Sequence, residues 1–390
     1  MSESPANPLL VILAVAAFAP LIAELPVRLR LPLVVAEVGL GIAVGPYGLD
    51  WVQPTGVINA LAELGLAALF FHAGMEIDFN AIRGRPLSLA ARGWLVSLVL
   101  AGGVAVALQW GGFVDATWYI AVGLTTTAIG TLLPILRDSG ELDSEFGHHV
   151  LAAGALGEFG PIVLLSVLLS RAGSIGGRSM LLVAFVTVAA AAAALAMRAR
   201  PPRLDALLER TLRTSSQLPI RVSLLMLGAF LMLADAFGLD VVLGAFAAGM
   251  VVGLAARGPA AEVFRQKLDA IGFGFLIPIF FVMSGARLDL AALAEPRSAA
   301  RVPLFLALFL FVRGTPALLW RHTLPRRDCV ALALYSATAL PLVVAISSIG
   351  VSDGHMRPEN SAALVGAGIL SVLLFPLAAL ALRAADRSTR

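Results

Sequence analysis

The chain has 390 residues, of which 59% are hydrophobic and only 14% are charged, and its mean hydropathy is +0.91. This composition excludes a water-soluble domain, in which about a quarter of the residues would be charged. The formal net charge of +3 does not indicate a nucleic-acid partner, because basic excess in a membrane protein usually reflects topology. The single cysteine, Cys329, excludes a disulfide framework and a cysteine metal cluster.

Apolar runs follow one another along the chain, separated by short polar segments, and a hydrocarbon core about 30 Å thick needs roughly 20 apolar residues per helix. They predict an all-α polytopic membrane protein, since a β-barrel would alternate apolar and polar residues. We expect no cleaved signal peptide, because no basic residue precedes the first run. Thirteen transmembrane helices are predicted, at 8–24, 31–47, 58–77, 87–109, 116–136, 148–170, 179–197, 218–236, 239–256, 268–285, 302–320, 328–350 and 361–382.

The loops between these spans differ in their content of basic residues. Twenty Lys and Arg residues fall on one side of the thirteen-span arrangement and six on the other. Loops rich in Lys and Arg stay in the cytoplasm. The sequence therefore predicts a bacterial-type cytoplasmic membrane protein whose N-terminus is outside and whose C-terminus is cytoplasmic.

The two halves of the chain contain similar segments about 210 residues apart. Residues 31–45 can be aligned with residues 239–253, which pairs Gly41 with Gly249 and Gly45 with Gly253. Further pairs in the same order are residues 70–78 with 280–289, Thr125-Thr126-Thr127 with Ser336-Ala337-Thr338, and Glu24 with Asp235. Four ordered matches favour a duplication over chance similarity of apolar runs.

This duplication predicts an inverted-topology repeat, because the offset spans seven helices, an odd number. Within a single transmembrane domain, 1–390, the first six-helix repeat covers 8–170 and the second covers 218–382. Residues 171–217 form a connecting span and a cytoplasmic linker. Many secondary transporters have such repeats, with two discontinuous helices crossing near the bilayer midplane.

The fifth and twelfth spans are the expected discontinuous helices. Thr125, Thr126 and Thr127 in one, and Thr338 with Pro341 in the other, place hydroxyl-bearing, β-branched and proline residues at mid-span. A helix is easily interrupted there, and the freed carbonyl groups could coordinate a cation. The alternative is that the threonine hydroxyls bond to the backbone of their own helix.

Glu158 is the strongest candidate for an ion-binding residue, since a carboxylate at membrane depth is costly and is expected to be functional. It lies about ten residues from either end of its span, beside Gly157, Gly160 and Pro161, which loosen the helix. Both a monovalent cation and a proton bind carboxylate oxygens, so their competition for Glu158 would couple one flux to the other. The alternative is a carboxylate in a permanent ion pair.

Arg313 is the second charge expected at membrane depth. Its side chain is too far from either membrane surface to reach it, so we expect it to contact an internal carboxylate or a helix C-terminus. Glu158 is the first candidate partner, and Glu63, Glu24 and Asp235 are the others. Because arginine does not lose its proton, Arg313 is expected to balance charge and not to carry protons.

The remaining polar residues give weaker predictions. Glu37 and Glu63 are as compatible with a structural as with a functional role, and His72 is expected to be a packing residue. The acidic stretch Asp138, Glu141, Asp143 and Glu145 is expected to form a solvated loop at the cytoplasmic surface, although it could attract cations. His148 and His149 follow it and begin the Glu158 span, where they could respond to pH. Glu76, Asp78, Arg287 and Asp289 are expected at the membrane interfaces.

Together these segments resemble the monovalent cation:proton antiporters, in particular the branch of bacterial sodium/proton exchangers and Kef-type potassium-efflux systems. The resemblance covers nearly the whole chain and rests on four segments. They are Leu31–Pro46, Glu63-Leu-Gly through Gly-Met-Glu-Ile-Asp78, Leu243-Gly-Ala-Phe-Ala-Ala-Gly249 and Pro278-Ile-Phe-Phe-Val-Met-Ser-Gly285.

The resemblance implies a secondary antiporter, not an enzyme, which forms homodimers and carries sodium or potassium and protons without a cofactor. It assigns Thr125–Ala128 to the family's unwound segment and Gly157-Glu158 to its acidic pair, and Arg313 to its buried basic residue, often lysine. Here glycine replaces the first acidic residue. One carboxylate and an arginine suggest one-for-one, electroneutral exchange. Kef-type proteins often carry a nucleotide-binding regulatory domain, which we do not expect within these 390 residues, since no phosphate-binding motif is present.

Two other functions stay open from the sequence. One is a sodium-coupled carrier of organic solutes with a similar inverted architecture, and the other is a membrane sensor that transports nothing. The sequence does not distinguish sodium from potassium or lithium, because selectivity depends on cavity size and oxygen geometry.

Overall fold

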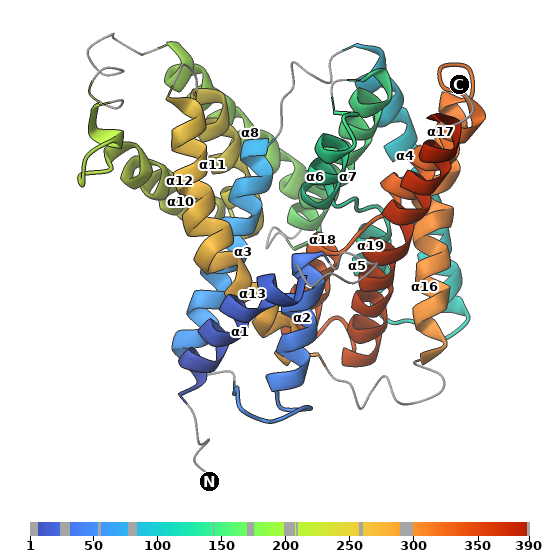
Figure 1. Ribbon diagram of the computed structural model, residues 1–390, viewed down its shortest axis with the longest axis horizontal. Coiled ribbons are helices and arrows are strands. Elements are labelled where there is room, and N and C mark those ends of the chain that lie inside the picture. The colour runs from blue at the N-terminus through green and yellow to red at the C-terminus, as the bar shows by residue number, and fades with distance from the viewer. Residues whose placement is uncertain are drawn as a thin grey trace. The chain divides into compact units, whose positions relative to one another are not determined.

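The computed structural model describes residues 7–23, 32–53, 56–76, 84–142, 144–169, 175–198, 207, 210–256, 260–288 and 299–387. Among these residues every regular element is a helix (Figure 1). Glu24, Asp78, Asp143, Asp289 and much of the expected linker within 171–217 lie outside the described residues.

The helices of the first part of the chain are α1 (Pro8–Ala23), α2 (Leu33–Val44), α3 (Gly56–Glu76), α4 (Arg85–Trp110), α5 (Thr117–Leu124), α6 (Ile129–Asp138), α7 (Glu145–Leu169) and α8 (Ile175–Arg198). Those of the second part are α10 (Leu218–Ala236), α11 (Val241–Ala255), α12 (Ala261–Ile271), α13 (Ile277–Ala286), α16 (Arg301–Phe309), α17 (Arg326–Ser336), α18 (Pro341–Ser352) and α19 (Pro358–Arg387). Two π-helical turns, η1 (Gly272–Leu276) and η2 (Leu310–Gly314), and a 3₁₀ helix, η3 (Thr315–Trp320), continue α12 and α16.

The prediction of an all-helical membrane protein is confirmed. Within the described residues, eight helical stretches are long and apolar enough to cross a membrane. Each coincides with a predicted span. Five shorter apolar helices, Pro8–Ala23, Leu33–Val44, Thr117–Leu133, Met180–Leu195 and Val241–Ala255, overlap the other five predicted ranges.

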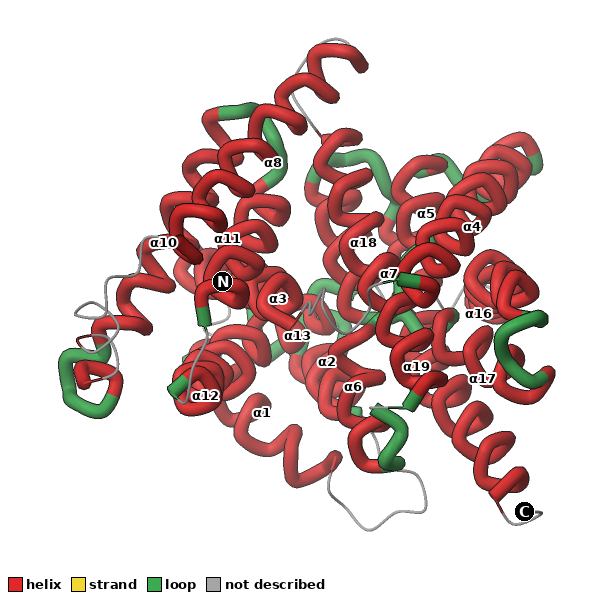
Figure 2. Tube along the Cα trace, turned by 90° about the horizontal axis from the view of Figure 1, so that it is seen from above, coloured by secondary structure: helices red, strands yellow, loops and turns green. Residues whose placement is uncertain are grey.

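The chain divides into two compact units. The first comprises residues 1–54, 78–161 and 281–390, and the second comprises residues 55–77 and 162–280. In the second unit α11 packs against α3, α8 and α10 (Figure 2). In the first unit α19 packs against α16, α17 and α18, and α5 packs against α4 and α18. The candidate site lies wholly within the first unit.

Two helix pairs approach so closely that only glycine fits at the contact. In the second unit, a Cβ atom on Gly249 of α11 would lie 1.9 Å from the Phe71 carbonyl oxygen of α3. In the first unit, a Cβ atom on Gly41 of α2 would lie 2.1 Å from the Val282 carbonyl oxygen of α13. Small residues allow such approach in membranes, where van der Waals packing drives helix association.

Candidate functional site

Two helices of the first unit are interrupted, as the sequence predicts. The backbone leaves helical geometry after Leu124 and resumes it at Ile129. It does so again between Ser336 and Pro341, the first residue of α18. Proline has no backbone N–H, so it is well suited to begin a helix. The predicted discontinuous helices are therefore present as α5–α6 and α17–α18.

The hydroxyl groups of the three threonines have different partners. Thr125 and Thr126 donate to carbonyl oxygens three residues earlier in α5, at 2.8 and 2.7 Å. Thr127 instead donates to the Ser336 carbonyl oxygen at the end of α17, at 2.5 Å. Local backbone bonding, the alternative weighed from the sequence, thus holds for the first two, and the helix is nevertheless interrupted.

The two interruptions, residues 125–128 and 337–340, are hydrogen-bonded to one another and together form a junction. The Ala128 amide donates to the Thr338 carbonyl oxygen at 2.8 Å, and the Thr127 amide donates to the Gly157 carbonyl oxygen of α7 at 2.9 Å. On the other side of the junction, the Ser371 hydroxyl of α19 contacts both the amide and the carbonyl of Ala339 at 3.0 Å. Backbone groups freed by the interruptions are thus satisfied within the protein, as a low-dielectric interior requires.

Arg313 reaches this junction from η2 and is 4% exposed. Its Nη2 donates to the Thr127 hydroxyl at 2.8 Å and to the Ala153 carbonyl of α7 at 3.0 Å. Its Nε donates to Thr127 at 3.0 Å and to the Ser336 carbonyl at 3.4 Å. The guanidinium thereby links both interruptions to α7.

The described hydrogen bonds of Arg313 thus end on neutral oxygen atoms. Of the two partners expected from the sequence, a helix C-terminus is the one found, because Ser336 is the last residue of α17. The partial negative charge of a helix C-terminus favours a cation there. An internal carboxylate as a further partner of Arg313 stays a prediction.

Gly157 and Glu158 lie on α7 beside this junction. A Cβ atom on Gly157 would lie 2.5 Å from the Thr127 hydroxyl oxygen and 2.7 Å from Arg313 Nη2. The space of a side chain at position 157 is therefore already filled by Thr127 and Arg313. The next residue, Glu158, is 6% exposed. Glu158 thus directly follows the residue of α7 that contacts Thr127 and Arg313.

Two polar residues near the start of the Glu158 span are more buried than the sequence predicts. His149 lies in the first turns of α7, as predicted, but it is only 1% exposed, and its Nδ1 accepts a hydrogen bond from Trp320 Nε1 at 2.9 Å. Glu141 is also buried, and both of its carboxylate oxygens accept from Arg383 Nε. This ion pair argues against a free acidic loop that concentrates cations.

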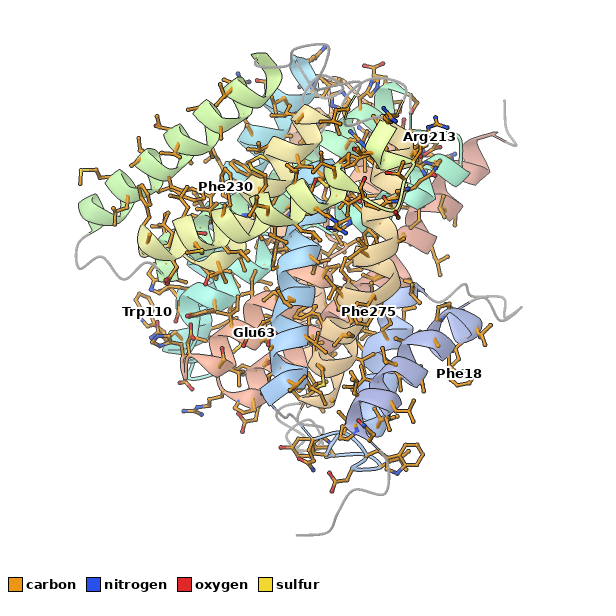
Figure 3. The ribbon with its side chains drawn as sticks, turned by 90° about the vertical axis from the view of Figure 1, so that its left-hand side faces the viewer. Phe18, Glu63, Trp110, Arg213, Phe230 and Phe275 are labelled. Atoms are coloured by element: carbon orange, nitrogen blue, oxygen red, sulfur yellow. The ribbon has the colours of Figure 1, made fainter. Side chains whose placement is uncertain are left out.

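The remaining predicted candidates are spread over both units. His72 is buried in α3, as expected of a packing residue, and it lies 3.5 Å from Asp269. Glu37 is buried in α2, whereas Glu63 is exposed on α3 (Figure 3). Glu76 is the last residue of α3, and Arg287 directly follows α13.

Sequence reasoning missed two serine hydroxyls that support the junction, and it identified Ser336 only through the alignment of the two halves. Ser97 of α4 contacts Arg313 Nη1 at 3.3 Å, Ser371 holds Ala339, and the backbone carbonyl of Ser336 accepts from Thr127 and Arg313. All three are buried. A small hydroxyl residue within an apolar span was the available signal, but a serine bonded to its own helix gives the same pattern.

Comparison with known proteins gives a consistent result. A family model described as "Sodium/hydrogen exchanger, transmembrane" matches residues 13–380. The putative Na(+)/H(+) antiporter YjbQ of Bacillus subtilis is 27% identical, over 97% of this chain and 63% of the relative. Two Bacillus cereus proteins are also similar. The probable Na(+)/H(+) antiporter GerT is 23% identical over 88% of this chain and 90% of the relative, and the Na(+)/H(+)-K(+) antiporter GerN is 25% identical over 67% of each.

Several relatives are longer than this chain. The chain spans less than two thirds of YjbQ and 43% of cation/H(+) antiporter 15 of Arabidopsis thaliana, to which it is 24% identical.

Proposed function

Because the chain belongs to the sodium/hydrogen exchanger family, we propose that it exchanges a monovalent cation for protons across a membrane. The geometry around Glu158 supports this function best. Glu158 is buried and directly follows Gly157, whose carbonyl accepts from the Thr127 amide in one of the two interrupted helices. The backbone oxygens and threonine hydroxyls of such helices are of the kind that binds alkali cations. Glu158 binds either the cation or the proton, and alternating access to the two sides carries them in opposite directions.

The roles proposed for Glu158 and Arg313 predict that the same charge moves in each direction. Arginine keeps its proton throughout, so Glu158 is the one group of the site that exchanges its ligand. The site then has the same net charge when it holds a monovalent cation as when it holds a proton. The exchange is therefore one-for-one and electroneutral, with sodium or potassium as the cation; the printed name of GerN includes both ions.

The whole architecture is proposed to be an inverted repeat with thirteen crossings. The two glycine contacts support it, because Gly41 and Gly249 are equivalent in the sequence alignment of the halves, and their contacts Val282 and Phe71 lie in the aligned segments 280–289 and 70–78. The pair α2–α13 then corresponds to the pair α11–α3. Each pair takes one helix from either repeat, as expected when two copies of a bundle are intertwined.

The orientation and assembly are also proposed. Loops that carry twenty of the basic residues face the cytoplasm, which places the N-terminus outside. A homodimer is proposed from the resemblance to dimeric antiporters.

Proton movement in proteoliposomes tests the function. An internal pH dye is followed while sodium, potassium or lithium is added to wild type, to Glu158→Gln and to Glu63→Gln, a control carboxylate exposed on α3. We expect one of the cations to move protons in wild type and in the control, and Glu158→Gln to be silent but folded by thermal unfolding. Because proton and cation compete, the KM for the cation should rise as the pH is lowered.

Two results would contradict the proposal. If Glu158→Gln still exchanges ions at the wild-type rate, Glu158 is not the shared site. If wild type moves protons with none of the three cations, the sodium-driven uptake of organic solutes is the next assay. A protein that is silent in that assay as well would be a sensor and not a transporter.

A further inference from the structure

The residues before Pro316 form an unusual helical segment that presents Arg313 to the junction. Helix α16 passes into the π turn η2, which contains Val312 and Arg313, and then into the 3₁₀ helix η3, which contains Pro316. π turns within α-helices are rare and are frequent at functional sites. The position of Arg313 therefore depends on what stabilises this turn.

Proline accounts for part of the irregularity. In an α-helix the Val312 carbonyl would accept a hydrogen bond from the amide of residue 316. Residue 316 is proline and has no such amide, so this carbonyl lacks its α-helical donor. The hydroxyl group of Ser97 in α4 donates to it at 2.9 Å.

The same hydroxyl oxygen also contacts the guanidinium. Arg313 Nη1 donates to Ser97 Oγ at 3.3 Å. Ser97 is fully buried, so water does not compete for these two bonds. One side chain thus holds the backbone directly before Arg313 and the far end of the Arg313 side chain.

The surface of α4 around Ser97 is shaped to receive the irregular segment. One turn earlier on the same face of α4 is Gly93, where a Cβ atom would lie 3.0 Å from the Trp320 ring and 3.5 Å from Pro316. The absence of a side chain at Gly93 therefore lets η3 lie against α4. This contact brings Ser97 within hydrogen-bond distance of η2.

We infer that Ser97 is a positioning residue, whose hydroxyl fixes the π turn and the Arg313 guanidinium against the junction of the two interrupted helices. This inference rests on the proposed function for its consequence in transport. Without the hydroxyl, the Val312 carbonyl loses its donor and Arg313 loses one of its bonds. The guanidinium is then held less firmly beside Thr127 and Gly157.

Three substitutions at position 97 separate the role of the hydroxyl from that of volume. Ser97→Ala removes the donor, Ser97→Cys keeps the volume with a weak donor, and Ser97→Thr keeps the hydroxyl. We expect Ser97→Ala and Ser97→Cys to lower the exchange rate about tenfold, the factor of one hydrogen bond to a charged group, and Ser97→Thr to retain more activity than either. Ser223→Ala is the control, because Ser223 is equally buried but donates only within α10, to Pro219.

Rescue by the conservative variant provides a readout that a general loss of folded protein would not move. At equal amounts of folded protein, Ser97→Thr should exchange ions faster than Ser97→Ala and Ser97→Cys, because it keeps the hydroxyl that contacts the Val312 carbonyl and Arg313. Equal rates in the three variants would overturn the positioning role.

Thermal unfolding in detergent tests the contact without any transport. The unfolding temperatures of Ser97→Ala, Arg313→Met and the double variant form a double-mutant cycle. We expect the unfolding temperature of the double variant to fall by less than the sum of the decreases in the two single variants. Additive losses would overturn the inference. If the losses are coupled but wild type exchanges no ions, the proposed function fails while the placement of Arg313 by Ser97 stands.

Discussion

At the scale of single residues, the packing around Gly157 explains why this chain has glycine where the proteins it resembles have the first residue of an acidic pair. The place of a side chain is taken by Thr127 and Arg313, whose polar atoms lie within 2.7 Å of the position that a Cβ atom would have. The glycine is therefore part of the packing of the junction. Glu158 remains the one carboxylate at these two positions.

Gly157→Ala is expected to destabilise the protein although alanine favours helices. The added methyl group must displace the buried Thr127 or Arg313, and overpacking of this kind costs about 1–3 kcal/mol. The exchange rate should fall with it, since Arg313 is moved away from the junction. Thermal unfolding and proteoliposome flux measure the two effects.

The matched control for Gly157→Ala is Gly103→Ala in α4, where a Cβ atom meets nothing within 4 Å. There the substitution should stabilise the protein by about 0.5–1 kcal/mol, because glycine is unfavourable within a helix. An unfolding temperature that rises equally in both variants would show that the space beside Gly157 is open.

At the scale of helices, close backbone contact through glycine forms the pairs α3–α11 and α2–α13. Gly249→Ala should separate the first pair, because the new methyl group would lie 1.9 Å from a backbone oxygen that cannot rotate away. We expect a loss at or above the upper end of about 1–3 kcal/mol. Gly228→Ala in α10, where a Cβ atom meets nothing within 4 Å, should leave the unfolding temperature equal or higher.

Much of this helical level could be predicted from the sequence. Span length and hydropathy located the helices, and runs of hydroxyl residues with Pro341 located both interruptions. The partners of those interruptions could not be predicted, because Thr127 bonds to a carbonyl 209 residues away, and spacing along the chain does not encode such pairs. The π turn at Arg313 was missed for a related reason. Pro316 signals a missing amide, but only the fold shows that Ser97 replaces it.

At the scale of the whole molecule, a partly buried cluster of charges joins distant parts of the first unit. Arg383 of α19 donates to both oxygens of Glu141 at 2.8 and 2.9 Å and also to Asp328 of α17. Its guanidinium stacks 3.6 Å from the centre of the Phe146 ring in α7. The cluster ties α19 to the loop after α6, the second half of one interrupted helix, and to the start of α17, the first half of the other.

Arg383→Met should therefore be strongly destabilising, because it leaves the carboxylate of Glu141 buried without its cation. Removing one partner of a buried ion pair costs about 3–5 kcal/mol. Arg357→Met is the control, since the Arg357–Asp115 pair is exposed on both sides and such pairs contribute about 0–1 kcal/mol. The unfolding temperature should fall much further in Arg383→Met than in Arg357→Met. Equal decreases would show that the cluster contributes no more to stability than an exposed ion pair.

The mutual hydrogen bonding of the two interruptions also bears on biosynthesis. The carbonyl groups that satisfy Thr127 and Ala128 belong to Ser336 and Thr338, so they emerge from the ribosome about 10–40 s later at typical elongation rates. During this interval the first interrupted helix exposes backbone groups that lipid cannot satisfy. We expect this segment to wait in a hydrated environment, such as the insertion machinery, until the second half of the chain arrives.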